Sequence, residues 1–384
     1  MKKTAPIYLD YAAASPLDPK VKAAMEPYFA GMFFNPSATY MVARRVNQDV
    51  GRARASLASL LGARQMEIIF TAGGTEANNL AINGVMQAHA GTNAVISAIE
   101  HDSILAPAGQ YKSKIARVQP DGRVDMEDLA AKIDDKTVLV SVIYANNEIG
   151  TIQPIRDVAK LIAAIKKERR QNGNDVPLYF HTDACQAAAY LDLHVGRLGV
   201  DLMTLNGGKI YGPKQSGVLY VKTGVKLKPQ ILGGGQEYGL RSGTENVPAI
   251  IGMAKAMELV QSRRESEVAR LRAFQALFID TLKVKLPEAI VNGSNKHRLP
   301  NNIHITLPGQ DNERLMMQLD ETGVICATGS ACSASNEEPS HVLKAIGLSD
   351  QEAQASLRFS MGQTTTKANI LYTVSTLAKI AGVS

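Results

Sequence analysis

The sequence predicts an α/β protein with a mostly parallel, seven-stranded sheet sandwiched by helices and a smaller α+β domain at its C-terminal end. Two observations lead to this fold class. Short apolar, β-branched segments alternate with amphipathic helical segments, which is typical of βαβ units. Most of the apolar segments are continuous in hydrophobicity rather than alternating, as in strands that are buried on both faces of a parallel sheet.

Seven segments fit such strands, and helical patterns at 76–89 and 154–170 lie between them. After residue 248 the apolar residues recur at steps of three or four. This spacing predicts a long helix that begins with Pro248 and ends near 282, with a break near 262–267. The expected strands of the sheet cover 67–71, 94–98, 115–118, 137–143, 178–182, 201–205 and 217–221.

The whole chain has 384 residues, a length that allows two or three domains. In its last third the pattern of apolar residues differs from that of the preceding part. We expect a large domain at 15–260, a small one at 261–384, and an N-terminal arm at 1–14 that packs with the small domain. Within the small domain the pattern predicts a strand at 302–306, helices at 311–321, 339–346 and 366–381, and a Gly- and Ser-rich loop at 328–336.

Composition excludes several classes of protein. With 45% hydrophobic and 20% charged residues the chain is neither disordered nor collagen-like. No segment approaches the roughly 20 apolar residues of a membrane span, and Asp10 interrupts the N-terminal apolar run before a signal-peptide core could form. The net charge is +6, and its densest run lies at 166–170, where a solvated helix end is favoured over a nucleic-acid patch. We therefore expect neither a membrane nor a nucleic-acid partner.

The three cysteines, Cys185, Cys326 and Cys332, are an odd number without zinc-site spacing. This usage fits the reducing cytoplasm better than a secreted disulfide framework. We predict a cytoplasmic protein without a metal site, in which at most one thiol takes part in chemistry.

Three motifs at predicted strand ends carry chemistry. Gly73, Gly74 and Thr75 precede a helix, where free N–H groups fit a phosphate and a plain capped turn about equally well. Asp183 follows a buried strand and would either cap a helix or pair with a cationic ring nitrogen. Lys209 lies after another strand and would be either a salt-bridge partner or an amine that forms a Schiff base. Together they are the three parts that a pyridoxal phosphate site requires.

Over essentially the whole chain, the sequence resembles the cysteine desulfurases, pyridoxal-phosphate enzymes of the class V aminotransferase group with the fold-type I architecture. Each motif is modest, but the segments run in family order. They are Tyr-Leu-Asp-Tyr-Ala-Ala-Ala (8–14), Asn-Pro-Ser (35–37), Gly-Gly-Thr-Glu-Ala-Asn-Asn (73–79), Glu-His (100–101), Asn-Asn-Glu-Ile-Gly (146–150), Asp183 with Gln186, Lys-Ile-Tyr-Gly-Pro-Lys (209–214), Arg-Ser-Gly-Thr-Glu-Asn (241–246), Gly-Ser-Ala-Cys-Ser (329–333) and Leu-Arg-Phe-Ser-Met-Gly (357–362).

The resemblance implies roles around the cofactor. Lys209 would hold it covalently and move protons, and Asp183 would pair with its ring nitrogen. His101 would stack on the ring and assist proton transfer. The cofactor's oxygens would be held by Gln186 at the ring and, at the phosphate, by Gly74, Thr75 and Asn206. Thr244 would reach the phosphate in the partner subunit of a homodimer.

The resemblance also implies a substrate site. Asn147 and Arg358 would bind the substrate carboxylate, which suits the planar fork of arginine. Cys332 would be the catalytic cysteine. Its small, polar neighbours are typical of a surface loop, where a thiol is accessible, although an incidental loop cysteine is the plainer alternative. Cys185 and Cys326 are interpreted as packed thiols, and His181 is given no role.

The implied reaction converts L-cysteine to L-alanine and leaves the sulfur on Cys332 as a persulfide. The sulfur would pass to an acceptor, such as an iron–sulfur scaffold protein, for cluster assembly or tRNA thiolation. A selenocysteine lyase or another class V transferase is one alternative. A catalytically degenerate scaffold for a sulfur-carrier partner is another.

Three positions depart from the family pattern. Asn206 and Gly208 stand where the family has Ser and His near the phosphate. Each lost contact to a charged group costs about 1.5–3 kcal/mol, so we expect cofactor binding that is weakened or compensated but not abolished. Gln363 stands where the family more often has Arg, a change that would affect either contact with the sulfur acceptor or local packing.

Overall fold

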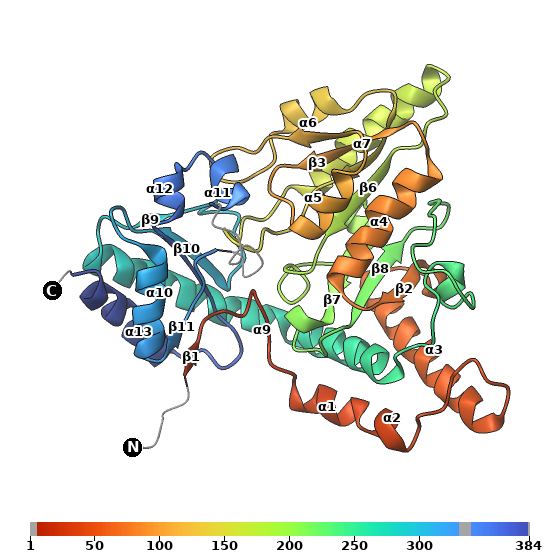
Figure 1. The fold of residues 1–384 in the computed structure, drawn as a ribbon, viewed down its shortest axis with the longest axis horizontal. Coiled ribbons are helices and arrows are strands. Elements are labelled where there is room, and N and C mark those ends of the chain that lie inside the picture. The colour runs from red at the N-terminus through yellow and green to blue at the C-terminus, as the bar shows by residue number, and fades with distance from the viewer. Residues whose placement is uncertain (1–5, 330–338, 383–384) are drawn as a thin grey trace.

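The computed structural model describes residues 6–329 and 339–382 (Figure 1). Its large sheet has seven strands in the order β2-β8-β7-β6-β5-β3-β4. All seven predicted strands are confirmed. They are β2 Ile68–Thr71, β3 Asn93–Ser97, β4 Ser113–Ala116, β5 Thr137–Ser141, β6 Tyr179–Asp183, β7 Leu202–Asn206 and β8 Gly217–Val221.

One strand of this sheet, β8, runs antiparallel to both of its neighbours, β7 and β2, while the other pairs are parallel. Only residues 207–216 connect β7 to β8. A parallel crossover needs about a dozen residues or more, so this short connection returns the chain as a hairpin. The sheet is therefore mostly parallel, as predicted.

Helices cover both faces of the sheet. Ile96 of β3 packs with α4 and α5, which lie in front of the sheet in Figure 1. Its neighbour Val95 points to the opposite face, into the larger core that includes α3 and α7. Strands buried on both faces explain the continuous apolar runs. The predicted helices 76–89 and 154–170 are confirmed, and this part of the chain contains α1 Pro19–Met25, α2 Pro27–Ala30, α3 Met41–Leu61, α4 Gly74–Ala88, α5 Asp102–Ala108, α6 Met126–Lys132, α7 Ile155–Gln171 and α8 Val195–Leu198.

The long helix α9 spans Val247–Lys285 as one element of 39 residues, so the predicted break near 262–267 is wrong. Those residues are polar, but none is the Pro or Gly that would interrupt the backbone ladder. Arg263 pairs with Asp18, and Glu267 pairs with Arg270, both with side-chain contacts under 3.5 Å. The polar stretch is thus an exposed turn of a continuous helix.

A second, antiparallel sheet has the order β12-β10-β9. The predicted strand 302–306 and the three predicted helices are confirmed. The strand β12 was not predicted, and the loop predicted at 328–336 lies largely outside the described residues. The elements are β9 Ile290–Val291, β10 Asn302–Thr306, β11 Val324–Ile325, β12 Ser356–Ser360, α10 Asn312–Glu321, α11 His341–Ala345, α12 Asp350–Ala353 and α13 Lys367–Ile380.

The N-terminal segment crosses from this smaller sheet to the large one. The strand β1, Ile7–Tyr8, pairs in parallel with β11. Asp10 bridges to Ser360 of β12, and Ser15 then donates to the carbonyl oxygen of Gly208, which follows β7. Residues 9–15 therefore run past the ends of both sheets.

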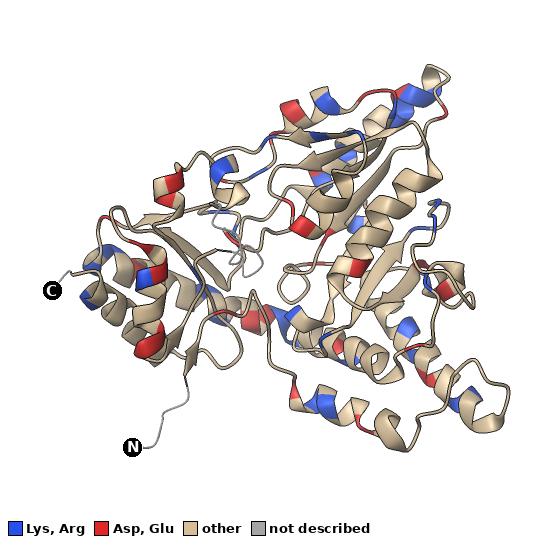
Figure 2. Cartoon of the chain, viewed as in Figure 1, with Lys and Arg blue, Asp and Glu red and all other residues tan. Residues whose placement is uncertain are grey.

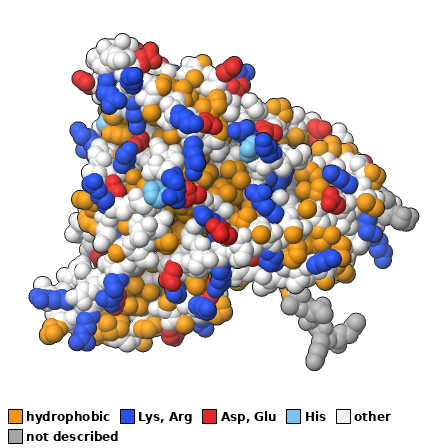
Figure 3. All heavy atoms as spheres, turned by 180° about the vertical axis from the view of Figure 1, so that it is seen from behind, with side chains coloured by type: hydrophobic (Ala, Val, Ile, Leu, Met, Phe, Trp, Pro, Cys, Tyr) orange, Lys and Arg blue, Asp and Glu red, His pale blue; other side chains and the backbone are white. Residues whose placement is uncertain are grey.

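Lys, Arg, Asp and Glu occur along the whole ribbon in Figure 2, and charged side chains of both signs are interspersed on the face that Figure 3 shows. The basic run near the end of α7 has partners of its own. Lys166 pairs with Asp201 at 2.8 Å, and the buried Arg169 donates to the carbonyl oxygens of Asp134 and Val176. Within the described ranges, no helix is long and apolar enough to cross a membrane, and no cluster of His, Cys, Asp or Glu could hold a metal ion.

A buried ion pair joins α3 to the 3₁₀ turn η3, Glu237–Gly239. Both nitrogens of the Arg54 fork donate to the carboxylate of Glu237, at 2.7 and 2.6 Å, and the side chains are only 10% and 3% exposed. Glu237 also accepts from the backbone N–H of Phe70 at 2.8 Å. This carboxylate therefore ties α3, β2 and η3 together.

We expect Glu237→Ala to lower the free energy of unfolding by about 3–5 kcal/mol, because it leaves a buried guanidinium uncompensated. Urea unfolding at a fixed protein concentration measures this. The matched control is Glu258→Ala, which removes an exposed pair with Lys255 and should cost less than about 1 kcal/mol. Equal losses in the two variants would contradict the assignment.

Candidate active site

One cavity of about 200 Å³ lies at the carboxyl ends of β5, β6 and β7. It brings together every predicted cofactor- and substrate-binding residue except Thr244. Its lining consists of Ala12, Ala13, Gly74, Thr75, Asn78, His101, Ser103, Ile143, Asn147, Asp183, Cys185, Gln186, Asn206, Lys209 and Arg358. Carboxyl ends of strands are where open α/β sheets bind ligands.

Asp183, the last residue of β6, is 5% exposed. Its Oδ2 accepts from Nδ2 of Asn78 at 2.7 Å, and its Oδ1 accepts from the backbone N–H of Cys185 at 2.9 Å. Both donors are neutral, and burial of a carboxylate is costly without an opposite charge. A cationic ring nitrogen in the cavity would provide that charge, so Asp183 suits the pyridinium of pyridoxal phosphate.

The first turn of α4 forms another wall. Gly73 has φ +139°, a conformation that L side chains rarely adopt. At Gly74 a Cβ would lie 2.9 Å from Sγ of Cys185, so a larger residue would crowd this wall. The free N–H groups at the start of a 15-residue helix favour a phosphate.

Asn206 lies at the end of β7, where the family pattern has serine. Its Oδ1 accepts from the backbone N–H of Gly208 at 2.9 Å, which fixes the orientation of the amide. Its Nδ2 lies 3.3 Å from where a Cβ of Gly74 would be. The amide therefore presents N–H donors toward the start of α4, beside the expected phosphate position.

Gly208 has no side chain to replace the family's histidine, and Lys214 covers it. A Cβ at Gly208 would lie 3.2 Å from Cδ of Lys214. The ammonium of Lys214 donates to the carbonyl oxygen of Ser15 at 2.5 Å, and burial lowers the pKa of Lys214. A histidine at 208 would require this lysine side chain to move.

Lys209 ends the 3₁₀ turn η2, Gly207–Lys209, directly after β7. Its Nζ donates to the carbonyl oxygens of Ala12 at 2.9 Å and Ala13 at 2.6 Å. Nε2 of Gln186 also donates to Ala12, at 2.9 Å. The N-terminal segment thus closes the cavity beside the lysine amine.

Arg358 lies in the middle of β12 and is 1% exposed. One nitrogen of its fork donates to the carboxylate of Asp10 at 2.7 Å and the other to the backbone carbonyl of Asn147 at 3.0 Å. A carboxylate and a carbonyl from distant segments therefore orient the guanidinium. Sequence reasoning did not single out Asp10, although it lies within the quoted segment 8–14.

Asn78 and Ser103 also line the cavity and were missed by the sequence analysis. Asn78 lies one helical turn after Gly74 and Thr75 on α4, and that spacing on one helix face could have identified it. It donates to Oγ of Ser103 at 2.8 Å, and Ser103 contacts His101. These two side chains join Asp183 to His101.

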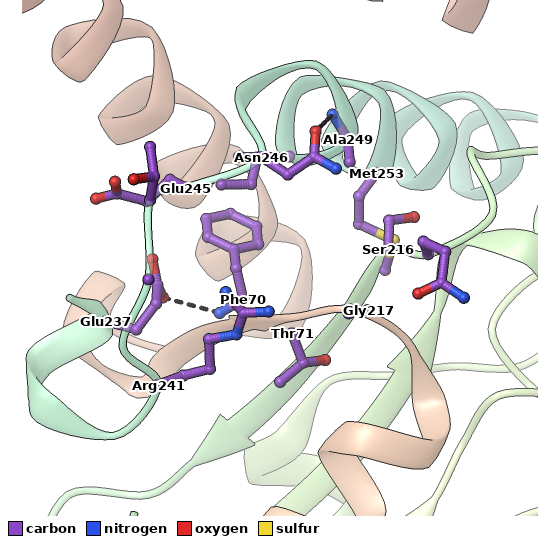
Figure 4. Close-up of a pocket in the computed structure, with 15 residues that line it drawn as sticks. Phe70, Thr71, Ser216, Gly217, Glu237, Arg241, Glu245, Asn246, Ala249 and Met253 are labelled. Atoms are coloured by element: carbon purple, nitrogen blue, oxygen red, sulfur yellow. Dashed lines mark hydrogen bonds between the residues drawn. The ribbon is translucent and has the colours of Figure 1, made fainter. Parts of the chain in front are cut away.

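Among the described residues, one predicted site residue, Thr244, is not brought into this cavity. Thr244 lines a separate pocket of about 190 Å³ together with Glu237 and Arg241, which is shown in Figure 4. Its predicted contact with a partner subunit's cofactor stays a prediction. Cys332 lies outside the described residues.

The other two cysteines are buried. Burial raises the pKa of Cys326 to about 12, and burial together with the nearby Asp183 charge raises the pKa of Cys185 well above its usual range. Both are therefore neutral thiols near pH 7, which suits packing rather than nucleophilic chemistry. His181 is fully buried between Ser141 and Thr204, and burial lowers its pKa to about 4.

Glu100 is a fully buried carboxyl group next to His101. Its Oε1 accepts from Oγ of Ser97 at 2.6 Å and from the backbone N–H of Ile143. Its Oε2 has no hydrogen-bond partner in the described part of the chain. Burial raises the pKa of Glu100 to about 8, so the folded protein holds this side chain protonated at pH 7.

This protonation predicts a pH dependence. Unfolded, Glu100 ionises near pH 4.3, so the folded state binds the extra proton up to pH about 8 and stability falls as the pH rises through that window. Between pH 7 and 8 we expect a loss of about 1 kcal/mol, which Glu100→Gln should abolish. The buried histidines have pKa values of about 6.5 in the unfolded chain, so they contribute little to the change in stability between pH 7 and 8.

Unfolding free energies at pH 7 and pH 8 test this expectation, with the exposed Glu258→Gln as control. A Glu100→Gln protein with the same loss as the unaltered protein would contradict it.

Comparisons with known proteins identify the family of the chain. The family model for class-V aminotransferases matches residues 7–372. A cysteine desulfurase IscS of Dictyoglomus turgidum is 40% identical over 382 residues, which covers 97% of this chain and 94% of that protein. The chain belongs to the cysteine desulfurase family, within the class-V aminotransferases.

Two solved structures have the same fold. A NifS-like protein from Rickettsia africae superposes with a TM-score of 0.87 at 31% identity, covering 98% of this chain and 100% of the other. A structure of SspA in complex with cysteine has a TM-score of 0.79 at 33% identity, covering 92% and 98%. The fold-type I architecture expected from the resemblance is thus confirmed for this cysteine desulfurase family member.

Proposed function

We propose that the chain binds pyridoxal phosphate and converts L-cysteine to L-alanine, with the sulfur carried as a persulfide on Cys332. One observation carries this proposal: Lys209, Asp183 and Arg358 line one cavity together with the first turn of α4. Relatives named cysteine desulfurase, and one solved in complex with cysteine, support the choice of substrate.

The cofactor, when bound, supplies an electron sink for chemistry at the substrate α-carbon. Lys209 would hold it covalently and move the proton at that carbon. Asp183 would keep a proton on the ring nitrogen, and the N–H groups at Gly74 and Thr75, with the amide of Asn206, would hold the phosphate.

Arg358 and Asn147 would bind the substrate. The carboxylate of Asp10 and the carbonyl of Asn147 each hold one nitrogen of the Arg358 fork, while Nε of Arg358 has no partner among the residues described. A preoriented fork meets a carboxylate with little loss of side-chain freedom. L-Cysteine would therefore lie with its carboxylate at Arg358.

Sulfur transfer requires the Cys332 thiolate. Its sulfur would attack the substrate sulfur, so that an S–S bond forms as the C–S bond breaks, and the electron pair left on the substrate takes up a proton to give L-alanine. The persulfide would then pass to an acceptor for iron–sulfur cluster assembly or tRNA thiolation. We further propose a homodimer in which Thr244 reaches the partner's cofactor, with the domain division at 15–260 and 261–384. The cytoplasmic location stays a prediction from cysteine usage.

The test incubates purified protein, pyridoxal phosphate and a thiol reductant, which releases the persulfide sulfur as sulfide, with L-cysteine and, separately, with L-selenocysteine. Alanine and sulfide from cysteine, at a higher kcat/KM than for selenocysteine, are expected. Faster turnover of selenocysteine would favour a lyase for that substrate. A protein that binds the cofactor and turns over neither substrate would contradict the proposal and favour a scaffold.

A further inference from the structure

The histidine of the cavity, His101, is also the N-cap of α5, and this double position determines where its proton lies. Nδ1 of His101 accepts from the backbone N–H of Ser103 at 3.0 Å. A backbone N–H can only donate, so Nδ1 carries a lone pair and the neutral ring has its proton on Nε2. Histidine is not among the usual N-cap residues.

A second donor reaches the same nitrogen. Oγ of Ser103 lies 2.8 Å from Nδ1 of His101. Asn78 donates to that oxygen through Nδ2 at 2.8 Å, which leaves the hydroxyl hydrogen of Ser103 for Nδ1. Two donors therefore converge on one lone pair.

The direction of this chain of hydrogen bonds is set at its far end by Asp183. Both oxygens of Asp183 accept hydrogen bonds, Oδ1 from the backbone N–H of Cys185 and Oδ2 from Nδ2 of Asn78 at 2.7 Å, so Asn78 presents its NH₂ group. The two hydrogens of this group serve Asp183 and Ser103. Asn78 is 1% exposed and Ser103 is 8% exposed, so water has little access to replace either contact.

We propose that Ser103 and Asn78 hold His101 as the Nε2–H tautomer, so that this ring acts in the reaction as a hydrogen-bond donor and not as the acceptor of the substrate α-proton. This inference rests on the proposed function. His101 lines the cavity, and accepting a proton at Nδ1 would break its bond to the N–H of Ser103. The amine of Lys209 is then the group that takes the proton. Ser103 and Asn78 are positioning residues that act through His101.

Nuclear magnetic resonance of the full chain with ¹⁵N-labelled histidine tests the tautomer, because long-range ¹H–¹⁵N couplings show which ring nitrogen bears hydrogen. The chain has seven histidines, and the signals lost in His101→Gln assign the ring. We expect the Nε2–H pattern both with and without pyridoxal phosphate. An Nδ1–H pattern would overturn the proposal.

Three variants test the positioning role. Ser103→Ala should move the His101 signals toward a mixture of tautomers and lower kcat about three- to tenfold, the value of one hydrogen bond, with KM for cysteine unchanged. Ser103→Thr, which keeps the hydroxyl, should restore both. Ser262→Ala, which removes an exposed hydroxyl on α9 that donates to the carbonyl oxygen of Leu259 in the same helix, is the matched control. A Ser103→Ala protein with the spectrum and kcat of the unaltered protein would overturn the role of Ser103.

The spectrum separates this inference from the proposed function, because it is recorded without substrate. The Nε2–H pattern in a protein that releases no alanine would support the tautomer and overturn the function. The Nδ1–H pattern in a protein that releases alanine would overturn the tautomer and support the function.

Discussion

Lys209→Ala is expected to yield a folded protein that loses its pyridoxal phosphate on desalting and forms alanine from cysteine about 10²–10⁴-fold more slowly. The exchange removes both the covalent hold on the cofactor and the amine that moves the substrate proton. Asp183, Asn206 and the start of α4 remain, so weak non-covalent binding of added cofactor should persist. Absorbance after desalting and alanine release measure the two losses separately.

The control for this prediction is Lys255→Ala, which removes a surface amine paired with Glu258. It should keep the cofactor and turn over like the unaltered protein. If Lys209→Ala instead retained the cofactor through desalting and turned over normally, another amine would be the covalent partner, and the assignment of Lys209 would be wrong.

Cys332→Ser is expected to keep the cofactor absorbance and lose turnover of cysteine to the detection limit. The hydroxyl of serine is not ionised near neutral pH and cannot take sulfur as a persulfide, whereas a thiolate can. Mass spectrometry of the unaltered protein after exposure to cysteine should find one added sulfur atom on the peptide that contains Cys332, and none in the variant.

The matched control for this exchange is Cys326→Ala. Burial raises the pKa of Cys326 to about 12, so its thiol stays protonated and the variant should still form the persulfide, with at most some loss of stability. Extra sulfur on Cys185 or Cys326, or turnover by Cys332→Ser, would show that Cys332 is not the sulfur acceptor.

The elements predicted best from the sequence are those whose signal is local. Each strand of the large sheet has an apolar run because helices cover both its faces, and the run can be read without knowing which helices they are. The strand β12 was missed for the opposite reason. Its central residue is Arg358, which is buried because it pairs with the carboxylate of Asp10. Asp10 lies near the other end of the chain, so the residues around Arg358 do not indicate this pair.

The break predicted in α9 was wrong for the same reason, because a local pattern does not indicate a contact with a distant segment. Ser262–Glu267 is polar, and polarity alone suggested an interruption. The ion pair of Arg263 with Asp18 instead stabilises the exposed turn from outside the helix.

The chemical groups of the site could be predicted from residue types and their positions in the sequence. A phosphate loop, a strand-end aspartate and a strand-end lysine follow from residue type and from the rule that ligands bind at the carboxyl ends of parallel strands. The assignment of Cys332 as the catalytic cysteine is based on the sequence alone.

The orientation of these groups depends on the packing of the whole chain. This packing places Asp10 and Asn147 on Arg358, turns the amide of Asn206 toward Gly74, and joins Asp183 to His101 through Asn78 and Ser103. The physical reason is that hydrogen bonds act over about 3 Å, while segments far apart in sequence come that close only when the whole chain is packed.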